Sequence, residues 1–234
     1  MSNARNISKL ASLAAHITNL IGLSASKAAI DAKVAAGDAV TSVNGATGAV
    51  TVSGGYSNMV VLTASGTWTV PAGITKAKVT VIGGGGGQSG QTVSLQYAPA
   101  GGVGGGVLKY VTGLTPGANI AVTVGAAGAA GATNGGNATA GGSSTFAAPG
   151  GTLTAGGGGF VAANSARITG GTGGTATGGD LNIPGISPAF PSSYDRAIPH
   201  PFGHTVYGRS SIGMQQAAVG PGTTGGPGAI IIEY

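Results

Sequence analysis

The stretch KAKVTVIGGGGG, residues 76–87, contains the two patterns that decide the fold. In its first half, Ala77, Val79 and Val81 alternate with other residues, and a period of two is typical of a β-strand with one buried face. Its second half, Gly83–Gly87, has no side chains that could join a hydrophobic core. We therefore expect β-strands that lead directly into glycine tracts.

Strand-like segments recur along the chain at a spacing of about ten residues, which favours a sandwich or small barrel-like β domain. The expected strands are Met59–Thr63, Thr67–Val70, Lys76–Ile82, Val107–Thr112, Ile120–Val124, Ser143–Ala147, Thr152–Ala155 and Ala229–Glu233. The sequence therefore predicts a mainly β protein with a β-sandwich-like body and long glycine-rich loops.

The glycine tracts between the strands are either disordered or held by close contact between backbones. Ordering glycine costs about 0.5–1 kcal/mol per residue relative to alanine. The apolar strands between the tracts favour order, in extended strands or polyglycine-II-like bundles whose hydrogen bonds join neighbouring segments or neighbouring chains. The main tracts are Gly83–Gly87, Gly101–Gly106, the Gly125, Gly128 and Gly131 triplets, Gly156–Gly159 and Gly170–Gly179.

Composition excludes several classes of protein. The chain has 49 glycines in 234 residues, 11 prolines, no cysteine and only 6% charged residues. Disulfide-stapled domains need cysteine, and collagen needs far more proline. A mean hydropathy of +0.31 argues against a solvated disordered chain. The net charge of +5 includes no basic cluster, so we expect no nucleic-acid partner, and no apolar run is long enough to insert into a membrane.

Residues 1–40 are predicted to form a helical segment for attachment and oligomerisation. Apolar residues recur there at alternating spacings of three and four, the pattern of a helical seam. This helix either packs on its own domain, or forms a bundle with identical chains or a plug into a larger assembly, and we favour the bundle or plug. A secretory signal is disfavoured because polar residues such as His16 interrupt the apolar stretch. The seam residues are Ile7, Leu10, Ala14, Ile17 and Ile21.

Residues 181–214 concentrate proline, aromatic, arginine and histidine residues, so we expect an irregular loop there. Aromatic faces and guanidinium groups suit the recognition of a sugar or protein surface, although the aromatics could equally form a small core. His200 and His204 also have a spacing known from metal sites, but we expect no metal, and we expect no cofactor elsewhere. The expected receptor contacts are Tyr194, Arg196, His200, Phe202, His204, Tyr207 and Arg209.

Catalysis is not expected, and we name no catalytic residue. Glycoside hydrolysis requires two carboxylates at a defined separation, and the body offers only Asp180, Asp195 and Glu233. The glycine tracts lack the lysine and hydroxyl residue that follow a phosphate-binding loop. The sequence therefore indicates a structural and recognition protein rather than an enzyme.

Several blocks of the chain together resemble the glycine-rich domain of bacteriophage tail fibres. The resemblance begins with Ser65–Thr75 (SGTWTVPAGIT), which is followed by Val79–Ile82 and the Gly83–Gly87 tract. The further blocks are Val43–Val52, Gly113–Gly117, Val122–Gly125, Gly141–Phe146 and Gly226–Tyr234. Together these blocks cover about residues 43–155 and 226–234.

The resemblance implies an extracellular virion protein that adsorbs to the host. Such fibres are typically homotrimers, which here would be intertwined, with the N-terminus on the tail baseplate or a proximal fibre protein. The distal end would bind a bacterial surface glycan or protein. A glycine-rich bacterial adhesin and a polysaccharide-depolymerising tailspike remain alternatives. The expected parts are 1–40 (attachment), 41–55 (linker hairpin), 56–180 (β domain), 181–214 (distal loop) and 215–234 (glycine-rich return and last strand).

Overall fold

The computed structural model describes residues 9–19, 22, 42–43, 46–47, 55–91, 97–98, 100–163, 170–188, 198–211, 214–215 and 220–234. Internal contacts divide the chain into two units, Met1–Gly54 and Gly55–Tyr234. The boundary falls at the end of the predicted linker, and each unit is described separately below.

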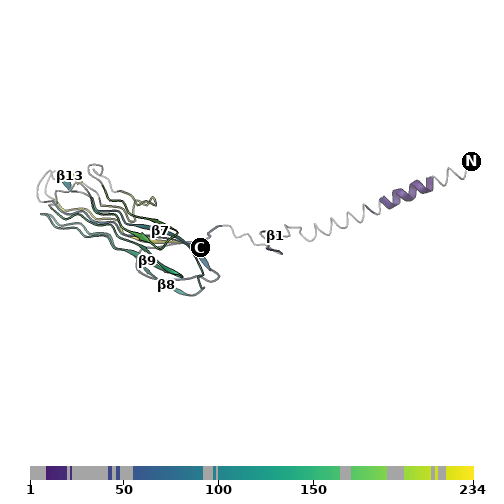
Figure 1. The fold of residues 1–234 in the computed structure, drawn as a ribbon, viewed down its shortest axis with the longest axis horizontal. Coiled ribbons are helices and arrows are strands. Elements are labelled where there is room, and N and C mark those ends of the chain that lie inside the picture. Colours follow the sequence, from purple (N-terminus) through teal and green to yellow (C-terminus); the bar gives the residue numbers. More distant parts are fainter. Residues whose placement is uncertain are drawn as a thin grey trace, which may run out of the picture. The chain divides into compact units, whose positions relative to one another are not determined.

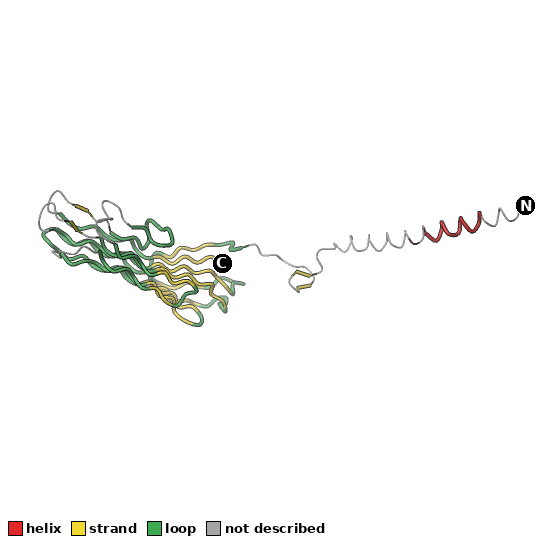
Figure 2. The backbone as a smooth tube through the Cα atoms, turned by 45° about the horizontal axis from the view of Figure 1, so that its top comes forward, coloured by secondary structure: helices red, strands yellow, loops and turns green. Residues whose placement is uncertain are grey.

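The N-terminal unit contains a helix over residues 9–19, drawn in red in Figure 2. Leu10, Leu13 and Ile17 on this helix are exposed, so no described residue covers these apolar side chains. Ala14 lies on the same helix, whereas Ile7 and Ile21 of the predicted seam lie outside the described residues. Strand β1 (Ser42–Val43) pairs antiparallel with β2 (Ala46–Thr47), which places a hairpin within the predicted linker.

The second unit contains two antiparallel sheets of five strands, so the predicted mainly β sandwich is confirmed and the barrel alternative is not adopted (Figure 1). The first sheet has the order β11 (Ala176–Thr177), β10 (Gly151–Ala155), β9 (Ser144–Ala148), β8 (Asn119–Thr123) and β4 (Gly66–Thr69). The second has the order β12 (Leu181–Ile183), β7 (Gly106–Thr112), β5 (Lys76–Ile82), β14 (Ala229–Glu233) and β3 (Met59–Leu62).

The hydrophobic core lies between the two sheets. Val79 and Val81 of β5, which alternate with outward-facing residues, are fully buried, as the period of two predicts. Trp68 packs against Phe146 with ring centroids 6.0 Å apart, and against Tyr234 at 5.9 Å. The last strand, β14, lies in the interior of its sheet between β5 and β3, so both chain ends of this unit meet in the same sheet.

Beyond the strands, the chain continues as extended segments that run side by side to the far end of the unit (green in Figure 2). These segments are 83–91, 100–105, 124–132, 136–143, 156–162, 170–175, 184–188, 208–211 and 220–228. At the far end, β6 (Tyr97–Ala98) pairs with β13 (Met214–Gln215). Apart from this two-stranded pairing, the described extended segments lie outside the regular strands, and their hydrogen bonds follow a different rule.

The rule is a period of three, which identifies a polyglycine-II bundle. Along the segment 83–91, successive amides donate to three different neighbours in rotation, as expected for an extended helix of three residues per turn. Toward the segment 136–143, the backbone N–H groups of Gly84, Gly87 and Gly90 donate to the carbonyl groups of Gly142, Thr139 and Gly136. Toward the segment 220–228, the N–H groups of Gly85, Gln88 and Gln91 donate to the carbonyl groups of Gly226, Thr223 and Gly220. Toward the segment 100–105, the N–H groups of Gly83 and Gly86 donate to the carbonyl groups of Gly105 and Gly102.

The segment 83–91 lies at the centre of this bundle and is buried along its whole length. Its carbonyl groups also accept hydrogen bonds from Gly128, Gly131, Gly158 and Ser211. The buried backbone groups named above are stabilised because they are paired with neighbouring segments. The bundle is thus held by lateral backbone hydrogen bonds rather than by a side-chain core.

The position of each segment explains its glycine pattern. In the central segment a Cβ at any residue from Gly83 to Gly87 would come within 3.0 Å of neighbouring backbone, so no side chain fits. In the peripheral segment 125–131 only Gly125, Gly128 and Gly131 are buried, and the alanines between them face outward. Glycine at every third residue is therefore sufficient at the edge of the bundle.

These tracts pack against one another within a single chain. The sequence left open whether the hydrogen-bond partners of the glycine tracts belong to neighbouring segments or to neighbouring chains. In the structure, segments of the same chain provide these partners. The packing of the glycine tracts therefore does not itself require intertwined copies. No helix among the described residues has the length and hydrophobicity needed to cross a membrane.

Candidate functional site

The predicted recognition loop begins with structure that belongs to the body. Leu181–Ile183 forms β12, an edge strand of the second sheet, and Gly185 donates a hydrogen bond to Gly174 in the bundle. The chain is next described from Ile198, where it forms a hairpin over residues 198–211. The backbone N–H of Ser210 donates to the carbonyl of Ile198, which closes this hairpin.

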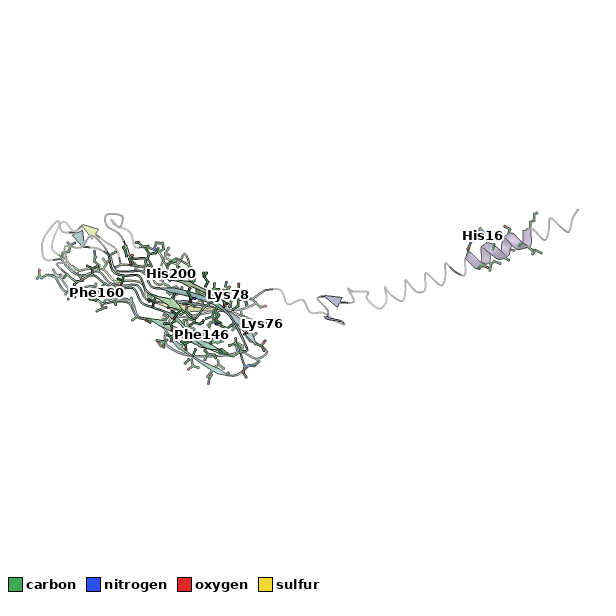
Figure 3. All side chains as sticks on the ribbon, in the orientation of Figure 1. His16, Lys76, Lys78, Phe146, Phe160 and His200 are labelled. Carbon is green, nitrogen blue, oxygen red and sulfur yellow. The ribbon has the colours of Figure 1, made fainter. Side chains whose placement is uncertain are left out.

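His200 occupies the turn of the hairpin. Its backbone N–H donates to the carbonyl of His204 at 2.9 Å, and its carbonyl accepts from Gly203 at 2.7 Å. Gly203 has a φ of 82°, a conformation that favours glycine. Figure 3 shows His200 between the strand end, marked by Lys76 and Lys78, and the far end, marked by Phe160. The turn therefore lies on the flank of the unit and not at its tip.

The His200 side chain is buried, with 2% of its surface exposed. Its Nε2 lies 3.1 Å from the carbonyl oxygen of Gly105, and its Nδ1 accepts the Phe202 N–H at 3.2 Å. These partners select the neutral tautomer with the proton on Nε2. Burial lowers the pKa of His200 below its ordinary value of 6.5, and the nearby His204 also lowers it, while the Gly105 hydrogen bond opposes the shift.

The hairpin fits closely because glycine lines the surface beneath it. A Cβ at Gly106, the first residue of β7, would come within 3.0 Å of His200 and Phe202. A Cβ at Gly208 would approach His200 and Ile82 as closely. Ile82 is fully buried although it ends β5 on the outward face of the sheet, because the hairpin covers it. The hairpin is therefore packed onto the junction between sheet and bundle.

The outward side of the hairpin presents three of the predicted contacts. The rings of His204 and Tyr207 meet edge to face with centroids 6.1 Å apart. Arg209 is half-buried, and its stem packs against Gly226 while Nη1 donates a weak 3.4 Å hydrogen bond to the Ser210 carbonyl. An aromatic pair offers a stacking surface, and a guanidinium group offers several donors. This arrangement suits binding to hydroxyl or carboxylate groups.

The predicted contacts thus divide into distinct groups. His204, Tyr207 and Arg209 are brought to one flank, whereas Tyr194 and Arg196 lie outside the described residues. The His200 side chain is buried and packs within the hairpin, so it offers little surface to a partner. Phe202 is half-buried and stacks on His200 with centroids 5.3 Å apart, so it also serves packing.

That His200 and His204 hold no metal stays a prediction, and the contacts of the His200 ring bear on it. Both ring nitrogens of His200 already have backbone partners, as described above. Within the described part of the chain, no three histidine, cysteine or acidic residues gather as metal ligands would. The two histidines instead contribute to the fold of the hairpin.

The outer face of the second sheet is a candidate surface that the sequence analysis did not identify. Val61, Tyr110 and Leu181 are exposed there, although they lie in regular strands. The signal was present in the strand MVVL, where both faces are apolar, whereas a strand with one solvated face alternates. An apolar run of this kind is typical of a strand whose sheet is covered on both faces.

Comparison with known protein families places this architecture. Residues 61–229 match the model of the family described as "Glycine-rich domain". The chain belongs to the glycine-rich domain family. The glycine-rich domain begins inside β3 and ends at Ala229, the first residue of β14, so it includes the bundle and nearly all of both sheets. No curated relative matches the chain in sequence.

Proposed function

We propose that this glycine-rich protein is the host-recognising part of a bacteriophage tail fibre, located on the virion tail and acting outside the cell. It binds a bacterial surface glycan or protein without changing it chemically. The residues that resemble fibre sequences support this proposal because they build defined parts of the fold. The block Ser65–Thr75 supplies β4 and the turn that follows it, and Gly226–Tyr234 supplies β14.

The observation that carries the proposal is the all-backbone bundle. A recognition protein on a virion must hold its binding surface away from the particle without bending. Extended segments that lie side by side and are joined laterally by hydrogen bonds give such a spacer, and they expose few charged side chains to proteases or salts. The turns that connect the bundle segments are free to differ in sequence, because the hydrogen bonds that hold the bundle lie between the segments themselves.

The N-terminal unit is proposed to attach the protein to the baseplate or to a proximal fibre protein. Its exposed side chains Leu10 and Ile17 form part of the predicted helical seam. Association of three such helices would produce the homotrimer expected of a fibre. Three copies would also strengthen a weak contact with the cell surface through avidity.

Binding is proposed to involve the flank formed by His204, Tyr207 and Arg209, together with Tyr194 and Arg196. The test uses the full-length protein, labelled with a fluorophore and incubated with a panel of bacterial strains. We expect saturable binding to a subset of strains, and a large loss of binding in the triple variant His204→Ala, Tyr207→Ala, Arg209→Ala.

A matched triple variant on the opposite side of the sandwich serves as the control. Thr67, Thr145 and Thr152 lie on the outer face of the first sheet, and their replacement by alanine should leave binding unchanged. Binding to no strain, or equal binding to every strain, would contradict the proposed function. Shortening of a bacterial polysaccharide during the incubation would instead favour the depolymerase alternative.

A further inference from the structure

The outer faces of the two sheets differ in chemistry. On the first sheet, the row Thr123, Thr145, Thr154 and Thr177 runs in register across four strands. On the second sheet, the corresponding row consists of Leu181, Leu108, Thr80, Ile231 and Val61. One side of the sandwich is thus a threonine face and the other is an apolar face.

The apolar face is open to solvent in the single chain. Among the described strands of both sheets, the exposed large hydrophobic side chains all lie on it: Met59 (64% exposed), Val61 (40%), Tyr110 (57%) and Leu181 (47%). Tyr56, just before β3, is also exposed and interacts electrostatically with Tyr110, Lys78 and Glu233. A contiguous surface of this kind on a soluble protein marks a contact with another macromolecule.

The charged groups on and beside this face nearly balance one another. Lys78 Nζ lies 2.7 Å from Glu233 Oε2, and at the β12 edge an Asp180 oxygen accepts the Tyr110 backbone N–H at 2.9 Å. With Lys76 added, the face and its edge carry two cationic and two anionic side chains, although the whole chain has a net charge of +5. A strongly acidic or basic partner would find no surplus of opposite charge here.

Charge balance favours another copy of the same chain as the occupant. Two positively charged molecules repel one another over most of their surfaces, but this face offers apolar contacts and no net charge. The face also begins at Tyr56, next to Gly55, the first residue of the second unit. Copies joined through their N-terminal segments would therefore meet near this part of the chain.

We propose that the apolar face, defined by Met59, Val61, Tyr110, Leu181 and Ile231, is the surface through which copies of this chain associate. The inference rests on the proposed homotrimer and not on host binding. It adds a second contact region to the N-terminal seam. The threonine face remains outward in the assembly.

The absence of cysteine makes a direct test available. Single substitutions Val61→Cys and Leu181→Cys on the apolar face are compared with Thr67→Cys and Thr152→Cys on the threonine face, all in the full-length chain. The rate of reaction with a fluorescent maleimide is measured at micromolar concentration, with the assembly mass determined by light scattering. We expect the apolar-face thiols to react at least about tenfold more slowly, and the rates to converge on dilution.

A second comparison checks the same inference without cysteine chemistry. The double variant Val61→Lys, Leu181→Lys should dissociate at higher concentration than wild type, while Thr67→Lys, Thr152→Lys should not. Equal thiol reactivity in a protein of trimeric mass would overturn this inference and leave the homotrimer standing. A monomeric mass would overturn both the homotrimer and the assignment of the apolar face as its contact surface. Fast labelling that slows only when bacterial polysaccharide is added would assign the face to a glycan and also overturn the inference.

Discussion

The hydroxyl of Ser144 donates a hydrogen bond of 2.6 Å to the carbonyl oxygen of Ile82, the last residue of β5. The same hydroxyl accepts the backbone N–H of Gly125 at 2.9 Å. Ser144 begins β9 and is completely buried. One side chain therefore connects both sheets to the first glycine of a peripheral bundle segment.

Replacement of Ser144 by alanine should destabilise the protein by about 1–3 kcal/mol, because it leaves buried backbone groups without a partner. The free energy of unfolding, measured in urea by the fluorescence of the single tryptophan, gives the value. Thr145→Ala on the adjacent threonine face should change it by less than about 0.5 kcal/mol. Equal effects of the two substitutions would contradict the role assigned to Ser144.

Glycine should be indispensable in the central segment and replaceable where there is space. Gly86→Ala places a Cβ against the backbone of Gly158 and Gly159, so it should cost about 3 kcal/mol or more, or prevent folding. Gly66→Ala in β4 is the matched control, because no atom lies within 4 Å of its added Cβ. Urea unfolding of Gly66→Ala should match that of the wild type or show a slight gain in stability.

Amide hydrogen exchange tests the bundle directly. The amides of Gly83–Gln88, Gly90 and Gln91 are buried and hydrogen-bonded, so they should exchange as slowly as those of β5. The exposed helix at residues 9–19 should exchange much faster in the isolated monomer. Rapid exchange throughout the glycine segment, with protected strands, would show that the bundle is not formed in solution.

Stability should fall as the solution becomes acidic, because His200 is neutral in the fold. Its pKa is lowered by burial, so the unfolded chain takes up a proton first as the pH decreases below about 6.5. The stabilising contribution is complete above that pH and is lost as the pH falls through the pKa of the folded state. Measuring the free energy of unfolding between pH 8 and pH 5 gives the slope of stability against pH.

Two substitutions identify the group responsible for that slope. His200→Gln should lower stability at pH 8 and flatten its dependence on pH. His204→Gln, which alters the neighbouring ring on the outward side, should preserve most of the slope. A steep dependence that persists without His200 would assign the effect to another group.

The contact between Trp68 and Tyr234 should contribute about 1–2 kcal/mol, from the aromatic pair and the apolar area that it buries. Tyr234→Ala should therefore lower the free energy of unfolding by this amount and shift the emission of Trp68 to longer wavelength. Phe160→Ala at a more exposed position provides the control, and its effect should be much smaller. Identical losses would show that Tyr234 is not part of the core.

The strands were predictable because their signal is local. In KAKVTVI the alternation of side chains places Val79 and Val81 on the buried face, and the structure confirms it. The glycine pattern held further information, because the unbroken run at 83–87 marks the centre and the triplet spacing at 125–131 marks the edge. Interpreting this spacing requires knowing that, in a threefold helix, successive Cβ atoms point toward different neighbouring segments. The sequence alone does not show which segments are neighbours.

The candidate site was predicted less completely. The sequence concentrates histidine, tyrosine and arginine at 198–211, but it does not reveal which side chains turn inward. His200 is buried because Gly106 and Gly208 leave room for its ring, and these glycines lie in parts of the chain distant from each other. The apolar face likewise depends on the register of strands that come from opposite ends of the domain, such as Val61 and Leu181.

The threefold rotation of hydrogen bonds along 83–91 constrains how the length of this protein can change. Inserting one or two residues into a segment would turn every later glycine away from its partner, whereas three residues add one full turn of about 9 Å. Because neighbouring segments are hydrogen-bonded along their length, an insertion in one segment would require insertions of the same length in its neighbours. Members of the family with longer or shorter stalks should therefore differ by multiples of three residues in several segments at once.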